Sequence, residues 1–571
     1  MPRSSAQKPK KEASSNPLPM PDPSVFLEGW NKAFESFKKI EIPDASIPQI
    51  SFDNEKLLQI QNNYLEQATH LWNQGLVNDP ILDDKRFKGP AWEKNPVASF
   101  SAALYLLNTK TLMAMTEAMQ ADAKTQARIK YAVEQLAAAT APSNYLALNA
   151  EAQQKIIDTK GESLAKGIQN LIHDMSQGHV SMTDESLFTV GENVATTQGS
   201  VVFENEYFQL IEYKPQTAQV YEIPLLLIPP CINKYYILDL QPKNSFVKYC
   251  CDQGFRTFIV SWSNPHEDLA HASWDDYVES GALKAIQVVK EIANVPQINT
   301  LGFCVGGTLL TSALAVSATK KNDSVASATL LTTLVDFTHS GVLDVFIDEA
   351  FVKYREAQFA DGGLMSGRDM ATTFSFLRPN DLVWNYVVGN YLKGETPPPF
   401  DLLYWNSDAT NLPGPMYAWY LRNTYLENNL IKPGKAKICG VSIDLTKVKV
   451  PLYIYGSRED HIVPIDASYA STQVFTGKKR FVMGASGHIA GVINPPAAGK
   501  RSHWIGPENK FPASVDTWIK NATEHAGSWW TDWTQWLGKH SGKKVPSPKA
   551  PGRGKYKVIE PAPGRYVKVK A

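Results

Sequence analysis

The chain has 571 residues, of which 43% are hydrophobic, so two or three structural units with sizeable cores are expected. Its 57 Lys and Arg balance its 57 Asp and Glu, so no global charge directs it to nucleic acid or to an anionic membrane. The five cysteines show no C-x-x-C spacing, which argues against a disulfide framework and a zinc site.

The N-terminal part of the chain divides into two segments. Residues 1–23 are rich in Pro, Ser and Lys and are predicted to be a disordered tail. Residues 24–195 repeat apolar side chains at helical spacing and predict an α-helical N-terminal domain. The start of the chain lacks the apolar segment of a secretion signal, and no stretch reaches the about 18 apolar residues of a membrane span. We therefore expect a cytoplasmic protein without a membrane span.

Residues 196–571 have a different pattern and predict an α/β catalytic domain. Short apolar or β-branched segments alternate with helical stretches, which is typical of a mainly parallel, doubly wound sheet; these segments are 201–215, 222–230, 255–263, 298–303, 325–337, 450–456 and 479–486. The alternation lapses between about 338 and 440, where aromatic residues, Pro and Asn are frequent, and we expect an inserted cap there. From about 540 the chain is basic and rich in Pro and Gly, which predicts an extended tail.

The segment INTLGFCVGGTLL, residues 298–310, has the spacing of a nucleophile turn between a strand and a helix. Gly302, Gly306 and Gly307 supply the small neighbours that such a strained turn requires. Cys304 stands at the nucleophile position, where the helix N-terminus favours a thiolate. No G-x-S-x-G occurs elsewhere in the chain, so Cys304 is the candidate nucleophile.

A thiol nucleophile needs a base, and the base needs an orienting acid. In the α/β-hydrolase fold the acid and then the histidine follow the nucleophile along the chain. Asp460 stands just past one predicted strand, three residues before Val463-Pro464, and His488 stands just past the next strand. We therefore predict a triad of Cys304, Asp460 and His488. His461 either supports this pair or serves packing alone.

The oxyanion hole of this fold uses the backbone N–H after the nucleophile and one from the loop after an earlier strand. The first of these is the N–H of Val305. In the loop LLLIPPCINKYY, Pro229 and Pro230 have no N–H, so the first available donor is Cys231. Aromatic residues of the cap, Trp405 among them, either line an apolar tunnel or pack in a core.

A cysteine at the nucleophile position has a chemical consequence. When a thiol accepts an acyl group from a thioester, it forms another thioester, so the exchange stays near balance and the acyl group remains activated. A serine would form an oxygen ester, and the energy lost would favour hydrolysis. The thiol therefore favours acyl transfer from a donor such as acyl-CoA to a hydroxyl group, although cysteine hydrolases exist.

The segment GFCVGGTLL resembles the active-site box of polyhydroxyalkanoate synthases. Further segments resemble blocks of that family in the same order: PPCINKYYILDLQPKNSFVKYC, VSWSNP, YGSREDHIVP and GASGHIAGVINPP. The C-terminal SWWTDWTQWL and PGRYVKVKA are similar to the family's ending. The resemblance is strong from about 200 to 571 and looser before it, and the overall length is similar to that of class I synthases.

This resemblance implies an activity and a site. Class I synthases polymerise short-chain (R)-3-hydroxyacyl-CoA, mainly 3-hydroxybutyryl-CoA, into polyester with release of CoA. Their catalytic residues fall on Cys304, Asp460 and His488, with a covalent acyl-thioester on Cys304. The resemblance also implies a homodimer at the surface of polyester granules, with granule-associated proteins as further partners. No cofactor or metal is expected, because CoA is a product. Whether His488 or Asp460 activates the 3-hydroxyl group stays open.

Two other interpretations remain at this point. A cysteine hydrolase of the same fold would release free acid, but such enzymes are usually much shorter and lack the helical N-terminal region. A granule-coating protein without activity would not need Cys, Asp and His in this order.

Overall fold

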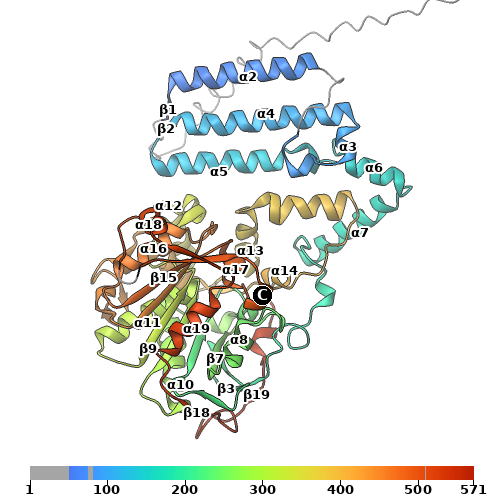
Figure 1. Cartoon of the computed structure of the whole chain (residues 1–571). Coiled ribbons are helices and arrows are strands. Elements are labelled where there is room, and N and C mark those ends of the chain that lie inside the picture. Colours follow the sequence, from blue (N-terminus) through green and yellow to red (C-terminus); the bar gives the residue numbers. More distant parts are fainter. Residues whose placement is uncertain (1–49, 75–81, 508–509) are drawn as a thin grey trace, which may run out of the picture. The chain divides into compact units, whose positions relative to one another are not determined.

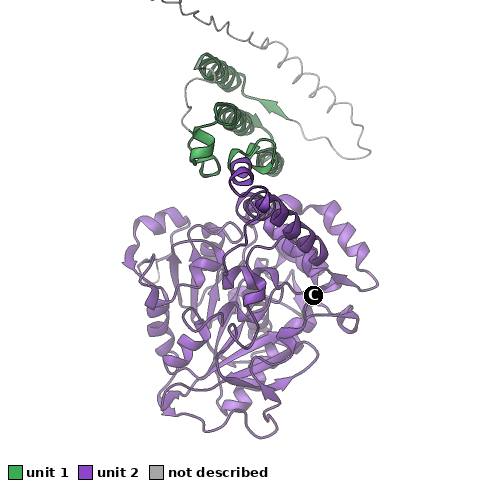
Figure 2. Cartoon of the chain, turned by 90° about the vertical axis from the view of Figure 1, so that its right-hand side faces the viewer, with its two compact units in different colours: residues 1–151 green, residues 152–571 purple. Residues whose placement is uncertain are grey.

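The computed structural model describes residues 50–74, 82–507 and 510–571 (Figure 1). The predicted tail and the first part of the predicted helical domain therefore lie outside the described residues. Contacts divide the chain into two compact units, Met1–Glu151 and Ala152–Ala571 (Figure 2). Within the described ranges, no helix is both long and apolar enough to span a bilayer.

Helices dominate the described part of the first unit, and polar side chains cap them. Asn95 accepts a hydrogen bond from the N–H of Ala98 at the start of α4, and Asp122 accepts from two N–H groups at the start of α5. Helix α4 packs against both α2 and α5. The elements are β1 (Ser51–Phe52), α2 (Asn54–Gln74), η2 (Lys85–Phe87), α3 (Pro90–Glu93), α4 (Pro96–Ala118), β2 (Met119–Gln120), α5 (Ala123–Ala139) and η3 (Pro142–Asn144).

Two further helices precede the sheet. Helix α6 (Ala150–Asp158) begins at the end of the first unit, and α7 (Glu162–Gln177) and η4 (Glu185–Leu187) belong to the second. Helix α7 packs against the later chain, where the Asn170 side-chain amide donates to the carbonyls of Asn390 and Glu395 at 3.0 Å. The first strand of the large sheet begins at Gly199, whereas the compact units divide at residue 151, so the predicted domain boundary at residue 195 stays a prediction.

An 11-stranded sheet forms the centre of the second unit. Its middle strands run parallel in the order β15-β14-β9-β8-β6-β7, and antiparallel strands extend both edges. This is the α/β-hydrolase arrangement that the sequence predicted. In spatial order the strands are β17 (Thr523–Ala526), β16 (Ser502–Ile505), β15 (Lys479–Gly484), β14 (Leu452–Ser457), β9 (Val325–Leu331), β8 (Ile298–Phe303), β6 (Leu225–Ile228), β7 (Thr257–Trp262), β4 (Phe208–Tyr213), β3 (Gly199–Glu204) and β19 (Glu560–Pro561).

Both faces of the sheet are covered, which explains why its strands appear in the sequence as continuous apolar runs. On β6, Leu226 and Ile228 enter one apolar core while Leu225 and Leu227 enter the other. The helices of this layer and its connections are η5 (Tyr235–Leu238), α8 (Phe246–Asp252), η6 (Glu267–Leu269), α9 (Trp274–Asp276), η7 (Tyr277–Leu283), α10 (Lys284–Ala293), α11 (Val305–Thr319), η13 (Leu445–Lys447), α16 (Ile465–Val474), α17 (His488–Val492), η14 (Pro496–Ala498), α18 (Val515–Lys520) and α19 (Trp530–Gly538).

Between β9 and β14 lies the insertion that the sequence predicted as a cap. Three of its segments, η9, η10 and η11, have π-helical geometry. Its elements are η8 (Gly341–Phe346), α12 (Glu349–Gln358), β10 (Leu364–Met365), α13 (Gly367–Phe376), η9 (Asn380–Trp384), η10 (Val387–Leu392), α14 (Asp401–Ser407), β11 (Leu412–Pro413), α15 (Gly414–Tyr420), η11 (Leu421–Leu426), η12 (Asn429–Ile431), β12 (Lys437–Ile438) and β13 (Val441–Ser442).

The basic C-terminal segment is extended and is tied to the rest of the second unit. Strand β18 (Lys544–Pro546) pairs with β5 (Gln219–Tyr221), β19 pairs with β3 at the sheet edge, and η15 (Tyr566–Lys568) follows. Short edge strands that contain Pro and charged residues have little apolar pattern, so nothing in the local sequence indicated these pairings.

Candidate active site

The predicted nucleophile stands on a strained turn between β8 and α11. Cys304 has φ 52° and ψ −128°, a backbone conformation that L-residues rarely adopt. The turn is held on both sides, because the Cys304 N–H donates to the Leu331 carbonyl at 3.0 Å and its own carbonyl accepts from Gly307 N–H at 2.8 Å. The side chain is partly exposed, although the residues of α11 from Val305 to Ser317 are all buried. A thiol is thus presented at the end of a rigid strand.

The glycines of the turn allow the close approach that this geometry requires. A Cβ on Gly302 would lie 2.5 Å from the Cα of Gly307. A Cβ on Gly306 would collide with the carbonyl oxygens of Ile228 and Pro229, and one on Gly307 would collide with Thr333. Each neighbour is backbone or a buried side chain, so none of them can move aside cheaply. The glycine pattern of the sequence is therefore explained by packing.

The predicted acid and base lie after two further parallel strands, on the other side of β9 from β8. Asp460 follows β14 and His488 begins α17 after β15. The Nδ1 atom of His488 lies 2.6 Å from Oδ2 of Asp460, and both side chains are buried. The other carboxylate oxygen of Asp460 accepts from the N–H groups of Ile462 and Val463, each at 2.9 Å. These bonds fix the carboxylate, which in turn orients the imidazole.

The imidazole of His488 is strongly basic in this setting. Burial lowers its pKa, but the charges of Asp460 and Cys304, together with hydrogen bonding to both, raise it to about 10. The Phe303 ring stacks on the imidazole with a centroid separation of 5.8 Å. The three predicted residues thus come together, and their catalytic roles stay predictions.

Comparisons with known proteins identify the family and the fold of the chain. A family model described as "Poly-beta-hydroxybutyrate polymerase (PhaC) N-terminus" matches residues 83–250, and one described as "alpha/beta hydrolase fold" matches residues 224–495. The poly(3-hydroxyalkanoate) polymerase subunit PhaC of Cupriavidus necator is 52% identical and covers 96% of each chain. The chain belongs to the poly(3-hydroxyalkanoate) polymerase family.

More distant members of the polymerase family match along most of the chain as well. The subunit PhaC of Rhizobium meliloti is 39% identical over 91% of this chain and 87% of its own. The polymerase of Methylorubrum extorquens is 40% identical over 91% and 88%. Among solved structures, a monoacylglycerol lipase of Paleococcus ferrophilus aligns with 48% of this chain and 89% of its own, at 13% identity and a TM-score of 0.30. The fold assignment rests on the sheet order and the family model.

In this polymerase, the surroundings of Cys304 include a buried cysteine and an aromatic wall. Burial, to which the nearby Cys304 adds, raises the pKa of the Cys231 thiol to about 12, so that thiol stays neutral. Burial also raises the pKa of Tyr420 and Tyr425, and Cys304 contributes to both shifts. The two phenol rings meet edge-on at 5.7 Å, and Tyr420 stacks on Trp274 at 5.2 Å. An aromatic cluster of the cap therefore lies within electrostatic range of Cys304.

The sequence did not single out Tyr420 and Tyr425. The only signal was their position in the aromatic-rich cap, which many other residues share. They are brought to Cys304 by the junction of α15 and η11, and short-range pattern does not indicate where that junction lies.

The predicted oxyanion donors stand where the fold places such groups. Val305 is the first residue of α11, where a helix leaves N–H groups without intrahelical acceptors. Cys231 follows β6 and the two prolines, and it is buried. The roles of both N–H groups stay predictions.

The two remaining predicted residues lie in different surroundings. His461 is partly buried next to Asp460, and burial lowers its pKa. Trp405 is buried, and its indole N–H donates to the Lys234 carbonyl at 2.7 Å. Trp405 therefore contacts the loop that carries Cys231, and its role as a tunnel residue stays a prediction.

Proposed function

We propose that the chain polymerises (R)-3-hydroxyacyl-CoA, mainly 3-hydroxybutyryl-CoA, into polyester with release of CoA, as a class I synthase. The observation that carries the proposal is the buried His488–Asp460 pair beside Cys304 on its strained turn. The family membership gives the reaction class, because the curated relatives are poly(3-hydroxyalkanoate) polymerases.

The first half-reaction loads the enzyme. His488 takes the proton of the Cys304 thiol, and the thiolate attacks the thioester carbonyl of the substrate. The backbone N–H groups of Val305 and Cys231 stabilise the oxyanion that forms. The carbon–sulfur bond to CoA then breaks, and the departing CoA sulfur takes the proton from His488. The products are free CoA and an acyl-thioester on Cys304, so no cofactor is required.

The second half-reaction extends the polymer. The 3-hydroxyl oxygen of another unit attacks the acyl-thioester, and its proton passes to His488, directly or with Asp460 as the base. The new ester bond forms as the carbon–sulfur bond to Cys304 breaks, and the thiolate regains a proton from His488. The raised pKa of His488, caused by Asp460 and Cys304 against the effect of burial, suits it to hold the proton between these steps.

Water competes with the hydroxyl group in this second step. Bulk water is far more concentrated, so polymer forms only where the hydroxyl is held in attacking geometry, at effective molarities that reach about 10⁵ M or more. Partly buried Tyr420 and Tyr425 support this part of the proposal, because their rings meet edge-on and both phenols are near enough to feel the charge of Cys304. Trp405 is proposed to extend that cluster.

Incubation of the purified chain with 3-hydroxybutyryl-CoA tests the proposal. We expect CoA release together with polymer. CoA release with free 3-hydroxybutyrate alone would indicate a cysteine hydrolase, and no release would contradict an enzyme of this type. We further propose a homodimer at polyester granules, to be tested by light scattering and by microscopy of the tagged full-length chain.

A further inference from the structure

Lys234 is a buried cation that the proposed reaction does not use. It stands three residues after Cys231, and only 2% of the residue is exposed. Its ammonium group donates to the backbone carbonyl of Val569, close to the C-terminus, at 2.5 Å. Burial lowers the pKa of Lys234 to about 8, although the charge of Asp408 acts in the opposite direction. A buried lysine is costly, so its partners need an explanation.

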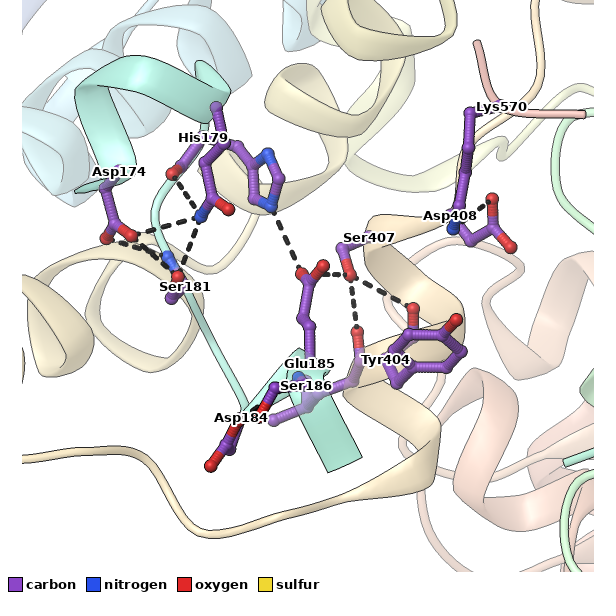
Figure 3. A network of polar contacts seen from close by, with 12 residues as sticks. Asp174, His179, Ser181, Asp184, Glu185, Ser186, Tyr404, Ser407, Asp408 and Lys570 are labelled. Carbon is purple, nitrogen blue, oxygen red and sulfur yellow. Dashed lines mark hydrogen bonds and ion pairs between the residues drawn. The ribbon is translucent and has the colours of Figure 1, made fainter. Parts of the chain in front are cut away.

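The neighbouring carboxylate of Asp408 is also buried. Asp408 directly follows the cap helix α14, and its carboxylate accepts a hydrogen bond from the Tyr236 hydroxyl at 2.9 Å. Its other oxygen lies 3.1 Å from the ammonium of Lys570, as Figure 3 shows. Lys570 also lies over the ring of Tyr404, 5.3 Å from its centroid. Residues at the C-terminus therefore contact both buried groups, Val569 the ammonium of Lys234 and Lys570 the carboxylate of Asp408.

Further hydrogen bonds connect residues 232–234 to the cap. The Ile232 carbonyl accepts from Thr410 N–H at 3.1 Å, and Asn233 forms a β-bridge with Ala409. The Lys234 carbonyl accepts from the indole of Trp405. The loop that carries Cys231 is thus hydrogen-bonded to the cap through its residues 232–234.

Asn264 completes the connection from the loop after β7. Its side-chain amide donates to the Lys570 carbonyl at 2.8 Å, and its oxygen accepts from Asn411 N–H at 2.9 Å. Asn264 thus joins the loop after β7 to both the cap and the C-terminal residues. Lys234 joins the loop of Cys231 to the same C-terminal residues through its bond to the Val569 carbonyl.

We propose that Lys234 is a positioning residue: bound to the Val569 carbonyl and next to Asp408, it fixes the loop 231–234 so that the Cys231 N–H meets the oxyanion. This inference rests on the proposed function, because it gives the Cys231 N–H its role in acyl transfer. The two prolines before Cys231 limit the loop on its N-terminal side. At its other end, the side chain of Lys234 adds a bond to the C-terminus to the bonds that residues 232–234 make with the cap.

The expected effect follows from the cost of a misplaced donor. Loss of one oxyanion donor lowers kcat by about 10²–10³-fold in enzymes of this kind. Releasing the loop displaces Cys231 without deleting its N–H, so a smaller loss is expected, about 10-fold to 100-fold in kcat. KM should stay within twofold, since Lys234 is almost fully buried and so offers little surface to a substrate.

The test compares Lys234→Met with the matched surface variant Lys243→Met in the full-length chain. Kinetics of CoA release from 3-hydroxybutyryl-CoA give kcat and KM, and thermal melting checks the fold. Lys234→Met should lose kcat and keep KM, while Lys243→Met, which is exposed, should equal the wild type. A Lys234→Met enzyme with wild-type kcat, or one that changes KM alone, would overturn the proposal.

Asp408→Asn provides a second measurement. It tests the proposal even where the Lys234→Met chain does not fold. It keeps the side-chain shape but removes the charge next to Lys234, and we expect a loss of about 3-fold to 10-fold in kcat. In the double variant the two losses should be less than multiplicative, because both changes release the same loop. Independent, fully multiplicative losses or an unchanged kcat in Asp408→Asn would contradict the proposal. If the wild type itself released no CoA, the proposed function rather than the role of Lys234 would fail.

Discussion

The strand ends that carry the triad and the cap beside them are built in different ways. Cys304, Asp460 and His488 each follow a parallel strand within a few residues, so the sheet register sets their positions. The cap contains three π-helical segments, and side-chain bonds such as those of Trp405 and Asn170 hold it together with a few backbone contacts. The sheet backbone therefore positions the three predicted catalytic residues, whereas the cap depends on side-chain bonds as well.

This contrast predicts two kinds of response to mutation. At the strand ends there is no room for adjustment, because Cys304 sits on strained backbone between glycines that touch neighbouring backbone. In the cap, π-helical segments and partly buried side chains allow local adjustment, and such segments are frequent at functional sites. Changes at the strand ends should remove activity outright, whereas changes in the cap should alter rate and product by degrees.

The largest effect is expected from removing the nucleophile. Cys304→Ala should lower CoA release by on the order of 10⁶-fold, with an unchanged melting temperature, because alanine fits the turn as cysteine does. Cys304→Ser should also lose several orders of magnitude, since a hydroxyl is much harder to deprotonate than a thiol. Mass spectrometry after substrate addition should show an acyl adduct on the wild type and none on Cys304→Ala. Normal turnover by a folded Cys304→Ala chain would remove Cys304 from the mechanism.

The base should come next, followed by the acid. His488→Ala should lose about 10³-fold or more in CoA release. Asp460→Asn should still accept one acyl group on Cys304, because a thiol needs less help from the third residue than a serine does. An acyl adduct in the mass spectrum of Asp460→Asn is the check. Turnover by His488→Ala at the wild-type rate would mean that another group is the base.

The same histidine should leave a signature in the pH dependence of stability. The folded-state pKa of His488 is about 10, above the ordinary value of about 6.5, so protonated His488 stabilises the fold. That stability is fully present below pH 6.5 and is lost as the pH rises towards 10. The wild-type melting temperature should therefore fall more between pH 7 and pH 10 than that of His488→Ala.

A third test sets a glycine of the nucleophile turn against a glycine of the cap. Gly306→Ala places a methyl group 2.6 Å from the Pro229 carbonyl carbon and should cost about 1–3 kcal/mol or more of stability, with a large loss of activity. Gly389→Ala, in the π-helical segment η10, meets only the Glu395 carboxylate at 3.4 Å and should be tolerated. Chemical denaturation and CoA release measure both. Equal effects of the two substitutions would remove the contrast between the regions.

These two regions also differ in how far the sequence alone could predict them. The strand-end positions of Cys304, Asp460 and His488 could be predicted because each residue lies next to a strand whose apolar run is local, and because glycine spacing marks the turn at Cys304. The contacts of Lys234 with Val569 and Asp408 could not be predicted from the sequence, since the three residues come from distant segments. Each of these residues looks like an ordinary surface or packing residue in its own segment. Burial of Lys234 depends on the C-terminal chain, whose short strands have no apolar pattern.

The aromatic wall should control product more than rate. Tyr425→Asp places a charge near Cys304 and should shift product from polymer towards free 3-hydroxybutyrate, with several-fold slower CoA release. The control is Tyr354→Asp, an exposed tyrosine of cap helix α12, which should leave the ratio of polymer to free acid unchanged. Trp405→Asp, measured in the same way, tests whether Trp405 extends the wall. An unchanged ratio in folded Tyr425→Asp would mean that this tyrosine does not exclude water.

The smallest effect is expected where the helical segment before the sheet meets the cap. Glu185 lies 3.1 Å from the His179 imidazole and accepts a hydrogen bond from Ser407 at 2.8 Å (Figure 3). The hydrogen bond to Glu185 is the main cause that raises the pKa of His179. Because the folded-state pKa is the higher one, this pair contributes stability below the ordinary histidine pKa of about 6.5, and the contribution is lost as the pH rises through the folded value.

Both side chains are about one-third exposed, at 35% and 31%, so solvent limits the contribution to less than about 1 kcal/mol. Glu185→Gln should therefore lower the melting temperature slightly at pH 6 and by less at pH 8.5, with kcat unchanged. Glu192→Gln, an exposed carboxylate in the same region, should show no difference between the two pH values. If Glu185→Gln destabilised the chain equally at both pH values, Glu185 would act by packing and by its bond to Ser407, without help from the charge on His179.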